Sequence, residues 1–317
     1  MTTSERPSLR GPGETALVAP VRPGWRDYLE LTKPRVVLLI VFTALVGMFL
    51  SVPGLPSVRA LVFGSLGIWL AASSAAAVNH VIDQRIDSEM ARTRHRPLPE
   101  GKMDEMRAVI FSLVLGAVSM ALLILWVNPL TALLTFASLI GYAIVYTLWL
   151  KRATPQNIVI GGAAGAAPPV LGWTAVTNEI HADALLLFLI IFAWTPPHFW
   201  ALAIARRDEY AKIGMPMLPV AYGIEMTRLH ILLYTIILTL ITIMPLLTGM
   251  CGVLYGVAAL LLDARFLWHA WRLYREAGAD PARPMRMFWW SIAYLGYLFA
   301  ALLIDHYTAA LLPLHGL

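Results

Sequence analysis

The stretch AVIFSLVLGAVSMALLILWV, residues 108–127, contains 20 consecutive residues without a charged side chain. A helix of this length crosses the roughly 30 Å hydrocarbon core of a bilayer. Similar apolar runs, bounded by charges, prolines or glycines, recur along almost the whole sequence after residue 34. They predict nine transmembrane helices near 35–52, 57–82, 107–127, 129–148, 156–176, 183–205, 226–247, 250–270 and 287–312. The sequence therefore predicts an all-α, polytopic membrane protein.

The composition supports a membrane protein and excludes several other classes. Hydrophobic residues make up 59% of the 317 residues and charged residues only 14%, against roughly 25% charged residues in soluble domains. The single cysteine, Cys251, allows neither an internal disulfide nor a cysteine-based metal site. The formal charge of +5 is explained by topology, because basic residues collect in cytoplasmic loops. No nucleic-acid partner is expected.

The placement of the basic residues predicts the orientation. With a cytoplasmic N-terminus, Arg59 is the only one of 24 Lys and Arg residues on the outer side. This distribution predicts nine crossings, with the N-terminus in the cytoplasm and the C-terminus outside. Residues 1–24, rich in proline and glycine, predict a flexible cytoplasmic tail before a single transmembrane domain, 25–317. Glu5 and Glu14 make the tail unlike a mitochondrial presequence, which favours the bacterial cytoplasmic (inner) membrane.

An acidic pattern marks the end of the second predicted helix. Asn79, Asp83 and Asp87 are spaced by four residues and therefore share one helical face. Oxygen ligands one turn apart suit Mg²⁺, which commonly bridges carboxylates to phosphate oxygens. The alternative is an interfacial helix end solvated by its loop, with ordinary ion pairs to Arg85 or Arg92. Spacing alone leaves both interpretations open.

Cations near this pattern are candidates for binding a diphosphate. Three arginines in the loop after Asp87 offer bidentate donors for phosphate oxygens, namely Arg92, Arg94 and Arg96, and Arg94 is the preferred candidate. Lys151 and Arg152 follow the fourth predicted helix and are candidates for the same role. The alternative is that these cations only reflect the positive charge of cytoplasmic loops. Lys151 and Arg152 would then be a stop-transfer pair at the cytoplasmic end of a helix.

The fifth and sixth predicted helices carry further candidates. The small residues of 161–167, followed by two prolines, allow either close helix packing or open space for a bulky ligand. His198, inside a kinked aromatic segment, is a candidate contact or iron ligand for heme, or else a hydrogen-bonded interhelical histidine. Asp208 follows the sixth helix and would supply a further metal ligand if that helix lies beside the second.

At these residues the chain resembles the UbiA-type superfamily of intramembrane aromatic prenyltransferases, in which acidic patterns end the second and sixth helices. The segments that carry the resemblance lie within residues 27–219 and are 27–35, 79–87, 150–162, 165–173 and 195–219. The Pro-Pro-His-Phe-Trp segment from Pro196 and the Gly-Met-Pro-Met-Leu-Pro segment from Gly214 point to the branch that farnesylates heme. Lys212 is a departure, because many relatives carry a second carboxylate there. It argues against a second Mg²⁺ and favours contact between Lys212 and the diphosphate.

The resemblance implies helices around a central cavity and a specific reaction. A farnesyl group would pass from farnesyl diphosphate to the vinyl group of heme B (protoheme IX), and water addition would give heme O for terminal oxidase biogenesis. Asn79, Asp83, Asp87 and Asp208 would be the catalytic residues and would hold Mg²⁺. Arg94, Lys151, Arg152 and Lys212 would bind the diphosphate, and His198 the heme. Membrane lipid and a heme A synthase are the implied partners.

Two other function classes fit parts of the sequence. A sister prenyltransferase would use a quinone precursor or chlorophyllide as its acceptor. A polytopic heme-handling transporter would also carry intramembrane acids and prolines. The acids here lie at the ends of helices and are accompanied by cations, which favours phosphate chemistry.

Overall fold

The protein is described from a computed structural model, which covers residues 23–275 and 280–311. Every regular element in these residues is a helix, and no strand is present among them. The elements in chain order are α1 (Trp25–Leu31), α2 (Pro34–Leu50), η1 (Ala60–Gly64), α3 (Ser65–Glu89), α4 (Glu105–Trp126), α5 (Pro129–Ile140), η2 (Gly141–Leu150), α6 (Lys151–Ala153), α7 (Asn157–Ala166), α8 (Pro168–Thr177), α9 (Ala182–Ala205), α10 (Arg207–Lys212), α11 (Leu218–Ala221), α12 (Gly223–Leu247), α13 (Val253–Arg275) and α14 (Arg283–Leu311). Stretches η1 and η2 have π-helical hydrogen bonding.

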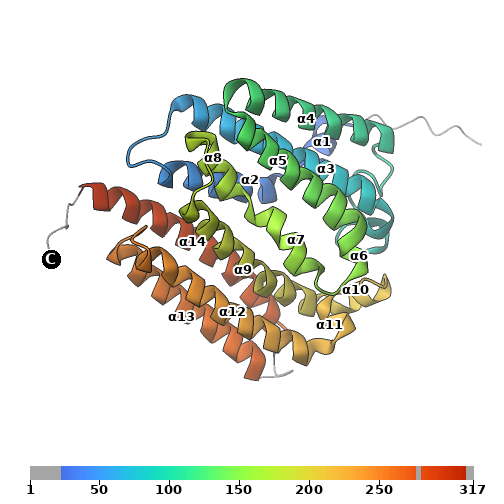
Figure 1. Ribbon diagram of the computed structural model, residues 1–317. Helices are drawn as coiled ribbons and strands as arrows, with labels where there is room; N and C mark the ends of the chain where they lie inside the picture. Colours follow the sequence, from blue (N-terminus) through green and yellow to red (C-terminus); the bar gives the residue numbers. More distant parts are fainter. Residues whose placement is uncertain (1–22, 276–279, 312–317) are drawn as a thin grey trace, which may run out of the picture.

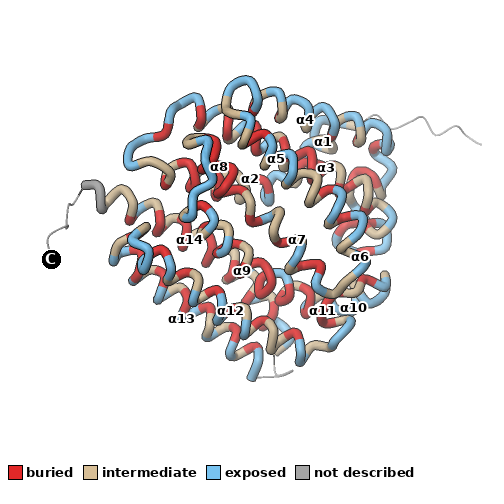
Figure 2. The backbone as a smooth tube through the Cα atoms, viewed as in Figure 1, coloured by how far each residue is buried: buried red, intermediate tan, exposed pale blue. Residues whose placement is uncertain are grey.

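The all-α membrane architecture is confirmed. Eight helices of the described residues are long and apolar enough to cross a membrane, and the bent pair α1 and α2 brings the number to nine. Figure 1 shows these helices packed side by side as one bundle, with α9 inside it. In Figure 2 the inner helices carry most of the buried residues, while outer helices such as α4 and α13 are exposed along one side. The exposed apolar side chains, including Leu113, Leu240 and Leu261, suit a lipid environment.

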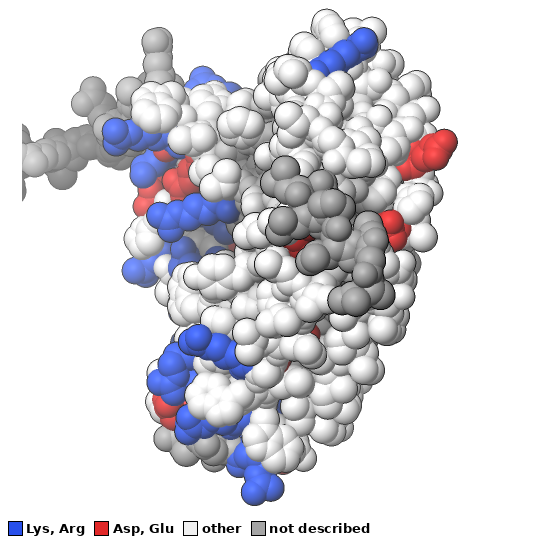
Figure 3. Space-filling view, turned by 90° about the vertical axis from the view of Figure 1, so that its left-hand side faces the viewer, with Lys and Arg blue, Asp and Glu red and all other residues white. Residues whose placement is uncertain are grey.

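One end of the bundle is basic. The last turn of α3, the short helix α6 and helix α10 lie together at this end, on the right-hand side of Figure 1. Figure 3 views the molecule from the left-hand side of Figure 1, away from this end; most of the face in view has no charged side chain, and Lys and Arg gather along one edge of it. We call this region, which includes Arg96, Lys151 and Arg206, the basic end of the bundle.

Helices α2 and α8 approach each other closely because two glycines leave room for backbone. A Cβ atom at Gly47 would lie 2.1 Å from the carbonyl oxygen of Pro169, and one at Gly172 would lie 1.9 Å from that of Ala44. Gly161 and Gly162 of α7 also meet neighbours, Tyr146 and Thr195 respectively. Close packing therefore explains part of the small-residue run in the fifth predicted helix.

We expect Gly172→Ala to destabilise the protein, because the added methyl group forces α2 and α8 apart. Overpacking of this kind costs about 1–3 kcal/mol or more. The thermal midpoint of the purified protein, followed by size-exclusion chromatography after heating, measures the effect. Gly165→Ala is the matched control, because no heavy atom lies within 4 Å of a Cβ at that position. Equal midpoints for the two variants would contradict the packing argument.

A buried carboxylate network ties the last three helices together. Asp263 of α13 accepts hydrogen bonds from Thr242 of α12 at 2.7 Å and from the Tyr294 hydroxyl of α14 at 2.5 Å. The Tyr255 hydroxyl donates to the Thr242 carbonyl at 2.8 Å. Both oxygens of this intramembrane acid therefore have partners, which gives it a structural role in fixing the register of α12, α13 and α14.

Candidate active site

Helix α3 carries the acidic pattern, and it continues further than the sequence indicates. The apolar run predicts an end near residue 82, whereas α3 extends to Glu89 and includes both aspartates. Asn79, Asp83 and Asp87 are all buried, with exposed fractions of 5% or less. Buried carboxylates require partners, and cations from two other segments supply them.

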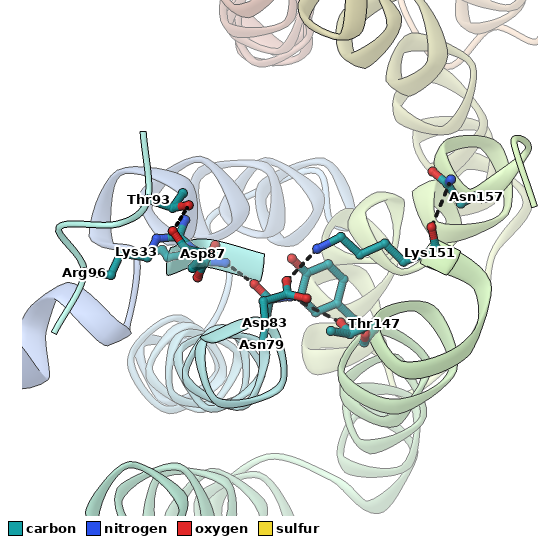
Figure 4. Close-up of polar contacts among 10 residues, drawn as sticks. Lys33, Asn79, Asp83, Asp87, Thr93, Arg96, Thr147, Lys151 and Asn157 are labelled. Carbon is teal, nitrogen blue, oxygen red and sulfur yellow. Dashed lines mark hydrogen bonds and ion pairs between the residues drawn. The ribbon is translucent and has the colours of Figure 1, made fainter. Parts of the chain in front are cut away.

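The first two partners come from opposite sides of α3. Lys151 Nζ lies 2.6 Å from Asp83 Oδ2, and Arg96 Nη1 lies 2.5 Å from Asp87 Oδ2. Figure 4 shows Lys151 and Arg96 approaching the helix from opposite directions, with Asn79 and Asp83 between them. These charge-assisted contacts are short and directional, which is typical of strong hydrogen bonds. They neutralise the carboxylates and allow the helix to continue through the motif.

A third cation reaches Asn79 from the break between α1 and α2. Lys33 has a φ of 48°, in the left-handed region that side chains other than glycine rarely adopt. Pro34 follows it and begins α2, so the chain turns by 53° at this point. The Lys33 ammonium donates a hydrogen bond to Asn79 Oδ1. The strained turn thus directs a lysine into the acidic site.

The amide of Asn79 connects these groups. Its Nδ2 donates to Asp83 Oδ2 at 2.8 Å and to Thr147 Oγ1 at 3.4 Å. Thr147 in turn donates to the Tyr142 carbonyl at 2.8 Å, within the π-helical stretch η2. π-helical geometry is common at functional sites because it re-aims side chains. Here it places Thr147 against the motif and Lys151 one turn further on.

The turn that carries Lys151 is held by a buried amide. Asn157 Nδ2 donates to the carbonyl oxygens of Thr154 at 2.8 Å and Lys151 at 3.4 Å. Figure 4 shows Asn157 on the far side of Lys151 from Asp83. Asn157 therefore positions the backbone from which the Lys151 side chain reaches α3.

The charge of this site favours an anionic ligand. Lys33, Arg96 and Lys151 contribute three formal positive charges, against the two formal negative charges of Asp83 and Asp87. Asp83 Oδ1 is buried without a hydrogen-bond partner among the described residues. A buried unpaired carboxylate oxygen is costly, and a cation is the ligand that would satisfy it. Hard oxygen donors one turn apart fit Mg²⁺.

The other predicted residues lie outside this cluster. Arg94 is exposed and contacts His95 at 3.2 Å, while Arg152 and Lys212 have exposed side chains. Asp208 is 88% exposed and lies 3.6 Å from Arg207. Groups of three or more His, Cys, Asp or Glu residues able to hold a metal are not found in the described part of the chain. The structure thus brings Asn79, Asp83, Asp87 and Lys151 together and leaves the remaining candidates apart.

Helix α10 nevertheless lies near the acidic site. Burial raises the pKa of Tyr210, and the nearby Arg92 guanidinium partly opposes this shift. Arg92, in the loop after α3, and Tyr210, in helix α10, therefore lie close enough to interact electrostatically at the basic end. Asp208 itself points away into solvent.

His198 lies in a separate aromatic environment within α9. Its ring stacks on Trp194 and Phe288, with centroids 4.2 and 4.6 Å apart. Its Nδ1 lies 2.7 Å from Ser291 Oγ, and the Ser291 hydroxyl donates its proton to the Phe288 carbonyl at 2.6 Å. Nδ1 must therefore be the donor in the first contact, which leaves Nε2 with a free lone pair. A neutral imidazole of this tautomer is suited to bind a metal through Nε2.

Sequence reasoning assigned no role to Lys33, Thr147 or Asn157. It considered Arg96, with Arg92 and Arg94, as a phosphate donor and preferred Arg94. Arg96 belongs to the same arginine-rich loop as Arg94, and only the fold decides which arginine reaches Asp87. The Lys33-Pro34 pair carried a signal, because a residue before proline is restricted and often marks a turn. Thr147 and Asn157 have no signal of this kind in the sequence.

Apolar helices long enough to span a membrane, with a buried carboxylate and cation site at one end, fit an intramembrane enzyme of the prenyltransferase class. The chain belongs to the UbiA prenyltransferase family, whose model matches residues 40–292. It is 61% identical to protoheme IX farnesyltransferase of Methylococcus capsulatus over 89% of this chain and 94% of that relative. It is 62% identical to the protein of the same name from Alkalilimnicola ehrlichii, over 89% of this chain and 92% of that relative.

Solved structures show the same fold. A structure from work on digeranylgeranylglyceryl phosphate synthase matches with a TM-score of 0.75 and 16% identity, covering 89% of this chain and 98% of that chain. A UbiA homologue from Archaeoglobus fulgidus, bound to DMAPP and Mg²⁺, matches with a TM-score of 0.61 and 17% identity, covering 87% and 99%. The arrangement of the spans is therefore that of the family.

Proposed function

We propose that this enzyme transfers a farnesyl group from farnesyl diphosphate to a vinyl group of heme B and that water addition yields heme O. The observation that carries the proposal is the buried site on α3, in which two carboxylates one turn apart each contact a cation. This arrangement would accommodate a metal-bound diphosphate, and the name of the relatives, protoheme IX farnesyltransferase, supports a farnesyl donor and a protoheme acceptor.

The residues present fit a divalent metal, as the partnerless Asp83 Oδ1 indicates. Asn79, Asp83 and Asp87 would hold Mg²⁺, which supplies Lewis-acid stabilisation of negative charge on the diphosphate. A bound diphosphate would offer phosphate oxygens to Lys33, Arg96 and Lys151. These would replace the Asn79 amide oxygen that Lys33 contacts now, and the carboxylate oxygens of Asp87 and Asp83 that Arg96 and Lys151 contact. Their excess positive charge then acts on the leaving group.

The chemistry requires no covalent enzyme intermediate. The bond between C1 of the farnesyl chain and the diphosphate oxygen breaks, and its electron pair leaves with the diphosphate. The π electrons of the vinyl group form the new carbon–carbon bond to C1. Water adds to the resulting carbocation and releases a proton to solvent. The cations of the site stabilise the charge that develops on the diphosphate, where they lower the barrier most.

His198 supports heme as the acceptor. Its Nε2 carries a free lone pair because the proton of the neutral imidazole stays on Nδ1, which donates a hydrogen bond to Ser291 Oγ. The stacked rings of Trp194 and Phe288 hold the imidazole in one orientation, which is the support that metal-binding histidines usually receive. We propose that His198 binds heme, either at the iron or at the porphyrin edge.

We expect His198→Ala to change the optical spectrum of bound heme B and to weaken its binding by about 10–100-fold. Ser291→Ala should produce a smaller change in the same direction, because the imidazole loses its tautomer-fixing partner. Titration of the purified protein with heme B, followed in the Soret band, measures both effects. His181→Ala is the control, since His181 is half-exposed and stacks on Trp173. An unchanged spectrum in His198→Ala would remove this residue from the site.

An acceptor competition tests the proposed function against a sister activity. The purified protein is incubated with labelled farnesyl diphosphate, Mg²⁺ and equal concentrations of heme B, a hydroxybenzoate, a quinone precursor and chlorophyllide. We expect the label in the heme fraction. Label in another acceptor would assign a sister prenyltransferase, and release of the label without transfer would contradict both.

The proposal also covers the orientation of the protein in the membrane and the membrane in which it lies. The basic end of the bundle faces the cytoplasm of a bacterial inner membrane, with the N-terminus inside and the C-terminus outside. The uneven distribution of Lys and Arg supports this orientation. The diphosphate would then reach its site from the cytoplasmic side. A heme A synthase as a partner stays a prediction.

A further inference from the structure

A second polar feature lies beside the acidic site, on the outside of the break between α1 and α2. A pocket of about 390 Å³ opens there against α3. Four cations border it, together with a single acid, Glu30; the cations are Arg26, Lys33, Arg35 and Arg96. A pocket with this charge favours an anion.

A buried histidine faces the same pocket. His80 of α3 borders it and is only 2% exposed. Neither of its ring nitrogens has a hydrogen-bond partner in residues 23–275 or 280–311. Native structures rarely leave buried polar atoms without a partner, so these nitrogens point to a polar ligand. His80 is not part of the acidic site, because it lies one position further round the helix than Asn79.

The surroundings of the pocket are those of a membrane interface. Trp25 is 69% exposed, and Leu29, Val36 and Leu38 also present exposed apolar side chains on α1 and the first turns of α2. Arg26 lies over the Trp25 ring, 5.4 Å from its centroid. Exposed tryptophan beside arginine is characteristic of the headgroup level of a bilayer. Cations therefore border the pocket together with the exposed apolar residues Leu29 and Val36, and Trp25 and Leu38 extend the apolar surface beside it.

We propose that this pocket binds the phosphate of an anionic phospholipid, whose acyl chains lie along the apolar residues of α1 and α2. The cations supply charge complementarity, and His80 supplies a buried donor to the phosphate oxygens. Basic pockets beside transmembrane helices bind lipid headgroups in this way. The exposed apolar rim favours a lipid over a free phosphate ion, since only the lipid covers that surface.

The lipid site shares Lys33 and Arg96 with the acidic site, so these two residues are unsuitable for a selective test. Arg26 and Arg35 border the pocket and make no contact with Asn79, Asp83 or Asp87 that the structure shows. Native mass spectrometry of the full chain in detergent, with added phosphatidylglycerol or phosphatidylcholine, measures lipid retention. We expect selective retention of phosphatidylglycerol. The double variant Arg26→Gln/Arg35→Gln should bind phosphatidylglycerol about 30-fold more weakly, and His80→Leu should also weaken this binding.

Matched controls separate the pocket from general surface charge. The double variant Arg107→Gln/Arg275→Gln removes two arginines that pair elsewhere, with Asp104 and Trp271. It should retain phosphatidylglycerol as the unchanged protein does. Thermal midpoints in phosphatidylcholine nanodiscs check that every variant is folded. Equal retention of both lipids, or normal retention by Arg26→Gln/Arg35→Gln, would overturn the proposal. Displacement of the lipid by inorganic phosphate or by heme B at equal concentration would also overturn it, by assigning the pocket to a different anion.

Discussion

Asp83→Ala and Asp87→Ala should each lower kcat/KM for farnesyl transfer by about 10³-fold or more, while the protein remains a folded membrane protein. Each change removes a carboxylate that would hold Mg²⁺, and loss of comparable transition-state stabilisation costs about 4 kcal/mol. It also leaves a cation, Lys151 or Arg96, without its present partner. Turnover is measured with purified protein across a range of Mg²⁺ concentrations.

Two comparisons make this test specific. Asp104→Ala is the matched control, because Asp104 caps α4 by accepting a hydrogen bond from the Arg107 N–H at 2.9 Å. It should cost about 1 kcal/mol of stability and leave turnover unchanged. Calorimetric binding of an unreactive farnesyl diphosphate analogue provides a second readout, and its dependence on Mg²⁺ should disappear in Asp83→Ala. Normal Mg²⁺-dependent turnover in both aspartate variants would contradict the metal assignment.

Lys151→Met should lower kcat by about 10²–10³-fold, because the ammonium is placed to stabilise charge on the departing diphosphate. The contact with Asp83 shows that this cation reaches the centre of the site, whereas the adjacent Arg152 is exposed. Methionine keeps most of the volume of the side chain and removes only its charge. Single-turnover measurements with saturating substrates separate the effect on chemistry from an effect on binding.

The control for the lysine is Lys102→Met, which removes the same charge from the same end of the bundle. Lys102 pairs with Glu100 at 2.6 Å, and its side chain is half-exposed. We expect wild-type kcat for this variant. A loss of equal size in Lys102→Met would show that general surface charge, rather than the position of Lys151, supports the reaction.

The helices were predictable from sequence because hydrocarbon imposes a single constraint on length and polarity. All nine predicted spans have counterparts in the described residues, although the first is a bent pair. The predicted span ends near residue 82 because charged residues usually end a span, although the spacing of Asn79, Asp83 and Asp87 already placed all three on one helical face. Here Lys151 and Arg96 neutralise Asp83 and Asp87, so α3 continues to Glu89.

The acidic half of the site was also predictable, because a spacing of four residues places side chains on one helical face. The cations that contact this acidic motif were less predictable from the sequence. Lys33 and Lys151 are far from the motif in sequence, and their contacts depend on tertiary packing. Choosing Arg96 over Arg94 requires the path of the loop after α3, which periodicity does not specify. The places of Asp208 and Lys212 at the site stay predictions.

The most direct test of the central proposal is the mass of the product. The purified protein is incubated with heme B, farnesyl diphosphate and Mg²⁺, and the extracted heme is analysed by chromatography and mass spectrometry. We expect a heme that has gained one farnesyl group and one hydroxyl group, formed only when Mg²⁺ is present. Unmodified heme, together with transfer of the prenyl group to a different acceptor, would contradict the account.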